Sequence, residues 1–149
     1  MKHILWLCFL SMFSAAFAQT ADDWAVWKMD YDASQIQKGK TVTVTFSAKL
    51  KAGYHVYSAT QPAKAVLPLT LVADKKNKGC VFEPFTEKGN RKVEFDEIFK
   101  ADIAYYDTDF QVIQKIKITK KKVPIKGHLS FQVCNDEMCL PGEYRFEIK

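Results

Sequence analysis

Apolar and polar residues alternate along much of the chain, most clearly in Thr41–Leu50. Every second position there is apolar, and threonine, serine or lysine stands between: Val42, Val44, Phe46, Ala48 and Leu50. A period of two sustained over ten residues predicts a strand with one buried face. Nine further segments of similar character predict strands at 24–31, 54–58, 67–73, 81–85, 92–95, 103–106, 110–119, 129–134 and 144–148.

No segment shows the sustained 3.6-residue apolar period of a capped helix. Short strands separated by glycine, proline, asparagine and aspartate predict an all-β fold, a β-sandwich. The 149 residues are 48% hydrophobic and 26% charged, which is the composition of an ordered globular protein and the length of a single domain.

The first residues carry the features of an export signal. Lys2 precedes an apolar run over 4–13, and Ala16-Phe17-Ala18 matches an A-x-A cleavage site. We therefore expect a signal peptide over 1–18, with Cys8 removed along with it, and one exported domain over 19–149. The alternative, a membrane anchor, needs about 20 apolar residues, more than this run provides.

The charge balance does not indicate a nucleic-acid partner. Lysine and arginine number 22 against 17 acidic residues, a net charge of +5 that is spread along the chain. The lysine-rich runs at 75–78 and 120–122 are interpreted as solvated turns rather than binding patches.

Two cysteines near the C-terminus are the strongest chemical signal. A strand-like segment that includes Phe131 leads to Cys134, and another follows Pro141. Turn-forming residues separate Cys134 from Cys139. Facing positions of a hairpin lie close enough for a disulfide, so we expect the two sulfurs to pair.

A bridge over so short a loop adds little stability. The chain-entropy model assigns it roughly 2 kcal/mol, against about 4.7 kcal/mol for a 100-residue loop. The spacing therefore favours a disulfide that is made and broken. The alternative, from another functional class, is a secreted β-sandwich interaction module whose hairpin disulfide is structural.

Metal binding by this pair and the role of the third cysteine of the expected domain are separate questions. Both cysteines with His55 or His128 could form a zinc or copper site, although their spacing fits the usual metal-binding motifs poorly. We expect no metal and no cofactor other than the redox-active disulfide. Cys80 stands alone and is interpreted as a small buried hydrophobic residue.

Three blocks of sequence resemble a known family. Phe131–Cys134 with Cys139-Leu140-Pro141, the segment 53–58, and Phe95–Phe99 are similar in order and spacing to the N-terminal periplasmic domain of the thiol:disulfide interchange protein DsbD. The resemblance implies an immunoglobulin-like β-sandwich with protein-disulfide reductase or thiol–disulfide interchange activity, a periplasmic location, and a monomeric state. Secretion is the second possibility for the location.

The same resemblance implies roles for single residues. Cys134 and Cys139 match the redox pair, and Cys139 takes the role of forming the mixed disulfide with partners. His55 and Tyr57 match two residues that line the site. The lid loop of the family corresponds to the acidic Asp96 and Glu97 followed by Ile98 and Phe99; alternatively, Ile98 and Phe99 are core residues at a strand edge.

The resemblance also implies the partners. They are periplasmic thioredoxin-like proteins, including some of cytochrome c biogenesis, and a membrane-embedded thiol reductase. The chain ends after the sandwich, so the reductase is expected to be a separate protein. One residue fewer lies between the cysteines than in well-known members, and His55 replaces a tyrosine.

Overall fold

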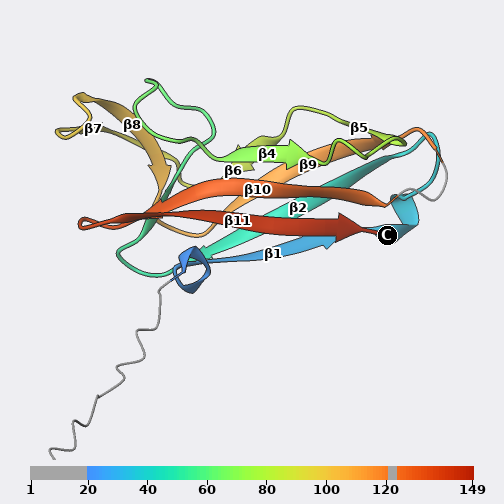
Figure 1. The fold of residues 1–149 in the computed structure, drawn as a ribbon, viewed down its shortest axis with the longest axis horizontal. Helices are drawn as coiled ribbons and strands as arrows, with labels where there is room; N and C mark the ends of the chain where they lie inside the picture. Colours follow the sequence, from blue (N-terminus) through green and yellow to red (C-terminus); the bar gives the residue numbers. More distant parts are fainter. Residues whose placement is uncertain (1–19, 121–123) are drawn as a thin grey trace, which may run out of the picture.

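The computed structural model describes residues 20–120 and 124–149, which form two antiparallel sheets packed face to face (Figure 1). The signal peptide expected over 1–18 lies outside the described residues. One sheet consists of β1 (Ala25–Tyr31), β2 (Thr41–Leu50), β9 (Phe110–Ile118), β5 (Cys80–Phe82) and β6 (Thr86–Lys88), in the order β1-β2-β9-β5 with β6 also on β9. Two short 3₁₀ helices are η1 (Ala21–Asp23) and η2 (Ala33–Gln35).

The second sheet carries the cysteine hairpin. Its order is β11-β10-β3-β8-β7, with β4 also paired to β10. Its members are β3 (His55–Tyr57), β4 (Thr70–Ala73), β7 (Lys92–Asp96), β8 (Ala101–Tyr106), β10 (Ile125–Cys134) and β11 (Cys139–Ile148). In the described ranges, no helix has the length and apolar character needed to cross a membrane.

The predicted β-sandwich is confirmed, with differences at individual strands. β2 has the predicted bounds, whereas β6 was not predicted. The strand expected at 144–148 begins five residues earlier, at Cys139, because Pro141 and Gly142 continue the strand instead of ending it. Proline lacks a backbone donor, and β11 is an edge strand, where that donor is not needed.

The core between the sheets is rich in aromatic side chains. Phe46 of β2 faces Phe146 of β11 with 4.9 Å between ring centroids, and Trp27 lies 5.3 Å from Phe131. These apolar positions alternate with exposed ones along each strand, so burial of one face accounts for the period of two.

A glycine opposite a buried ring allows the cysteine hairpin to pack on this core. Gly142 pairs with Phe131 across β10 and β11. A Cβ atom on Gly142 would lie 2.4 Å from the Phe131 ring and 2.8 Å from the Cβ of Ala21 in η1. The absence of a side chain at this position therefore leaves room for the ring.

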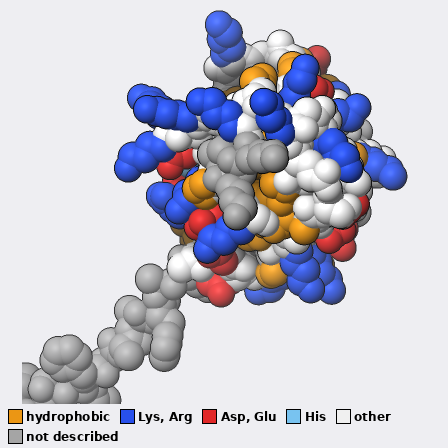
Figure 2. All heavy atoms as spheres, turned by 90° about the vertical axis from the view of Figure 1, so that its right-hand side faces the viewer, with side chains coloured by type: hydrophobic (Ala, Val, Ile, Leu, Met, Phe, Trp, Pro, Cys, Tyr) orange, Lys and Arg blue, Asp and Glu red, His pale blue; other side chains and the backbone are white. Residues whose placement is uncertain are grey.

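The end of the sandwich opposite the cysteine hairpin is basic. The turn before β2 and the start of β5 both bond to the end of β9: Gly39 N–H donates to Ile118 O, and Thr119 N–H donates to Gly79 O. Gly39 has φ +90°, a conformation that favours glycine. Figure 2 views this end and shows basic side chains spread around it. The turns carry six exposed lysines: Lys38, Lys40, Lys75, Lys76, Lys78 and Lys120.

Candidate functional site

Cys134 and Cys139 form a disulfide at the tip of the β10–β11 hairpin. They are the last facing pair of the two strands, with Cα atoms 4.0 Å apart. The turn between them is closed by Asn135, whose N–H donates to Met138 O at 2.9 Å. Its side-chain Oδ1 accepts from the N–H groups of Glu137 and Met138, at 3.0 and 2.8 Å. The expected hairpin and pairing are therefore present.

The two sulfurs of this pair differ in access. Cys134 is 1% exposed because β10 is an inner strand, with β11 on one side and β3 on the other at this point. Cys139 is exposed, since it lies on the edge strand. A small apolar cluster on the outer face of the sheet also covers Cys134: Tyr57, Ile103, Ala65, Val66, Ala101 and Tyr105.

Strand β3 brings His55 and Tyr57 to the disulfide, as the resemblance implies. His55 faces Cys134 across β3 and β10, and Tyr57 Oη lies 3.9 Å from Cys139 Sγ. A disulfide sulfur carries no hydrogen, so the tyrosine is the donor in this contact. Burial lowers the pKa of His55 and raises the pKa of Tyr57. Both groups are therefore neutral near pH 7.

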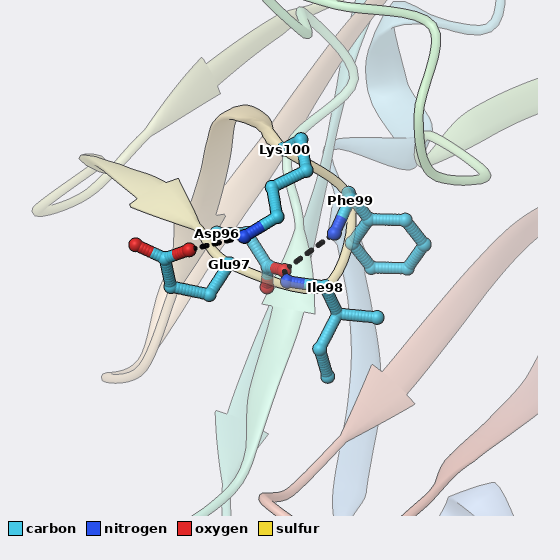
Figure 3. A network of polar contacts seen from close by, with 5 residues as sticks. All are labelled: Asp96, Glu97, Ile98, Phe99 and Lys100. Carbon is cyan, nitrogen blue, oxygen red and sulfur yellow. Dashed lines mark hydrogen bonds and ion pairs between the residues drawn. The ribbon is translucent and has the colours of Figure 1, made fainter.

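The turn after β7 lies at the same end of the molecule (Figure 1). Asp96 Oδ1 accepts from the N–H groups of Ile98 and Phe99, and Glu97 pairs with Lys100 at 2.6 Å (Figure 3). Ile98 is 86% exposed and Phe99 is 42% exposed, so the alternative that they are core residues is wrong. The turn leaves Cys139 uncovered in this conformation.

A pocket of about 370 Å³ lies beside the disulfide. Its lining comes from β3, β7, β8 and the hairpin turn, and it includes His55, Tyr57 and Asp96 but not Glu97. Its polar lining also includes residues that are not among the sequence-based site candidates: Glu94, Tyr105, Asp107 and Asp136. The alternation along β8 places Tyr105 on the same face as Ile103, but only the pairing of β8 with β3 shows that this face meets the cysteines.

The remaining candidates lie elsewhere. Across residues 20–120 and 124–149, no cluster of three or more His, Cys, Asp or Glu side chains is placed to hold a metal. His128 lies 4.0 Å from Glu143, farther along β10 from the cysteines. Cys80 lies in the other sheet, partly buried against the main core, and burial raises the pKa of its thiol.

Known proteins share this fold. The family model for the N-terminal region of the thiol:disulfide interchange protein DsbD matches residues 25–149. The N-terminal periplasmic domain of ScsB from Proteus mirabilis superposes with a TM-score of 0.61 and 12% identity, over 89% of this chain and 49% of that one. This chain thus spans about half the length of that domain.

Two further structures come from Neisseria meningitidis. The DsbD N-terminal domain in the reduced form has a TM-score of 0.56 and 19% identity, over 86% of each chain. A structure of the complex between the DsbD and PilB N-terminal domains has a TM-score of 0.48 and 18% identity, over 82% of this chain and 81% of that one. No curated protein matches the sequence significantly. The likeness to the ScsB domain and to the reduced DsbD domain supports the expected immunoglobulin-like arrangement of the sandwich.

Proposed function

Since the chain belongs to the DsbD N-terminal domain family and is thus a thiol–disulfide exchange domain, we propose that its Cys134–Cys139 pair relays electrons. The donor is a membrane-embedded thiol reductase, and the acceptors are periplasmic thioredoxin-like proteins. The observation that carries this proposal is the disulfide at the hairpin tip, with one buried and one exposed sulfur.

The surface around the disulfide suits a protein partner. Of the nine exposed large hydrophobic side chains in the described part of the chain, five lie on β7, its turn or the hairpin tip: Val93, Phe95, Ile98, Phe99 and Met138. Gathered exposed apolar groups mark surfaces that bind other proteins. A partner docked on them would bring its own thiol to the exposed Cys139.

The exchange follows from the unequal access of the sulfurs. A donor thiolate attacks Cys139 Sγ, the bond to Cys134 breaks, and Cys134 leaves as a thiolate. The second donor thiol then attacks the mixed disulfide, so the donor is released as a disulfide and this domain keeps two thiols and two electrons. The reverse sequence, begun by the Cys139 thiolate on a client disulfide, passes both electrons on. The Tyr57 hydroxyl is placed to donate to a thiolate at Cys139.

The location and extent of the domain belong to the same proposal. Residues 1–18 direct export and are removed, and residues 19–149 act in the periplasm. The periplasmic description of the ScsB domain supports this, as does the need of a disulfide relay for an oxidising compartment.

A reduction potential tests the proposed function. For the Cys80→Ser variant, in which only one cysteine pair titrates within 19–149, we expect a value between about −180 and −270 mV, as for exchange proteins. The measurement is the fraction of reduced protein across a series of thiol redox buffers. A value below about −300 mV is typical of a structural disulfide and would favour the interaction module instead.

We also propose that residues 96–99 act as a lid that closes over the disulfide. The apolar Ile98 and Phe99 are exposed on a turn held by Asp96, and Asp96 also lines the pocket beside the cysteines. Exchange requires access to the sulfur, so Phe99→Ala is expected to speed reduction by glutathione a few-fold. Ile98→Ala should act in the same direction.

The control for the lid is Val93→Ala, which also removes an exposed apolar side chain but lies on β7 itself. Rates are measured from the loss of oxidised protein under excess glutathione. Equal rates for the folded wild type, Phe99→Ala and Ile98→Ala would rule out the lid.

A further inference from the structure

The pocket beside the disulfide combines aromatic rings with carboxylates. His55 lies between Tyr57 and Tyr105, with ring centroids 5.3 and 5.2 Å away. Four carboxylates line the same pocket: Glu94, Asp96, Asp107 and Asp136. Among the residues described, no lysine or arginine lines it. The pocket is therefore negative and has aromatic walls.

The internal pairing leaves part of this charge unmatched. Lys92 Nζ pairs with Asp107 Oδ2 at 2.6 Å, and Tyr105 Oη donates to Glu94 Oε2 at 2.6 Å. The other oxygen of Asp107, Oδ1, is buried without a hydrogen-bond partner in the described structure. A buried acceptor in this state is costly.

Such surroundings select a cation. Tyrosine rings attract ammonium and guanidinium groups through their faces, and carboxylates add charge attraction. Burial lowers the pKa of His55, so its neutral ring does not repel a positive group. An anionic group would meet four carboxylates, and a purely apolar group would gain nothing from their charge.

We propose that this pocket binds a basic side chain, lysine or arginine, that a partner carries near its reactive cysteine. The inference rests on the proposed function, because it makes the pocket a recognition site for exchange partners. Two contacts connect pocket and disulfide: His55 faces Cys134, and Asp136 belongs to the turn between the cysteines. A partner whose basic side chain entered the pocket would hold its thiol at the hairpin tip.

Three thiol peptides that differ at one position test this proposal. They are acetyl-Cys-Gly-Lys-amide and its analogues with norleucine or glutamate in place of lysine. Reduction of the Cys134–Cys139 bond is followed under excess peptide, and rates are expressed per thiolate to remove differences in thiol pKa. We expect the lysine peptide to react about three- to tenfold faster than the norleucine peptide, and the glutamate peptide to react slowest.

Two variants separate the pocket from the general field around the sulfurs. Asp136→Asn removes a carboxylate that lines the pocket, whereas Glu137→Gln removes the neighbouring carboxylate, which does not line it. Asp136→Asn should lower the lysine-to-norleucine ratio at least about twofold, and Glu137→Gln should keep it. Equal lysine and norleucine rates in the wild type, or the same fall in both variants, would overturn the proposal.

A binding measurement separates this proposal from the proposed function. Acetyl-lysine-methylamide should shift the ring proton signals of His55 in the oxidised protein, and acetyl-norleucine-methylamide should not. If no peptide reduces the disulfide, the reduction potential still decides the proposed function, and the shift decides the pocket. If the peptides reduce it but lysine causes no shift, the pocket proposal alone is overturned.

Discussion

Cys134→Ala is expected to capture a thioredoxin-like partner as a covalent complex through Cys139, and Cys139→Ala is expected to capture little. Cys139 lies exposed on the edge strand, whereas Cys134 is buried under the cluster around Tyr57. Without Cys134, no thiol of the hairpin remains to resolve the mixed disulfide. Because attack depends on access, the two rates should differ by at least about tenfold.

The measurement uses a partner with one reactive cysteine, activated as a mixed disulfide with thionitrobenzoate. Each capture releases one coloured thiolate, and the complex appears on a non-reducing gel. Both variants carry Cys80→Ser, and both lack the Cys134–Cys139 disulfide. A loss of stability caused by the missing disulfide therefore affects both variants and does not explain a difference between their capture rates. Similar rates, or faster capture by Cys134, would show that the assignment of Cys139 is wrong.

Gly142→Ala is expected to lower the free energy of unfolding by about 2–3 kcal/mol, a cost in the range for overpacked cores. The added methyl group would overlap the ring of Phe131, which is buried against Trp27, and would also approach Ala21. None of these groups can move away without disturbing the core. Denaturant unfolding of the wild type and the variant measures the difference.

A second substitution tests that explanation. Phe131→Leu removes the ring atoms that the new methyl group would meet, so in this background Gly142→Ala should cost less, with a coupling of about 1 kcal/mol. If the cost is unchanged by Phe131→Leu, overlap with the ring is not its source. A wild-type-like stability for Gly142→Ala alone would contradict the packing described here.

Much of the sandwich follows from local sequence pattern. Thr41–Leu50 has one buried face over its whole length, and its period of two therefore gives the strand with correct bounds. β6 has only three residues, Thr86–Lys88, too few for a period to show. The start of β11 was placed too late because Pro141 and Gly142 usually end strands, and their tolerance depends on the edge position and on Phe131.

In the site, too, some features follow from local sequence and others depend on long-range strand pairing. The pairing of Cys134 with Cys139 could be predicted, because the two cysteines are only five residues apart in sequence and the turn lies between them. The difference in their exposure agrees with the sequence around them, since an apolar strand precedes Cys134 and Pro141 follows Cys139. Asp107 and Tyr105 could not be placed, because their position depends on long-range pairing of β8 with β3 and of β3 with β10.

The separation of charge along the sandwich has a consequence for diffusion. β10 and β11 run from the lysine-rich end to the cysteine tip through ten facing pairs, which span about 30 Å. The turns at the tip carry four carboxylates, Asp96, Glu97, Asp136 and Glu137, against one lysine, Lys100. A molecule charged in this way is an electric dipole, and the field of an approaching cationic protein exerts a torque that turns the carboxylate end toward it. At about 0.01 M salt, where the Debye length is about 30 Å, this torque shortens the time that the two proteins need to reach the productive orientation. The torque largely disappears near 0.15 M, where the Debye length is about 8 Å.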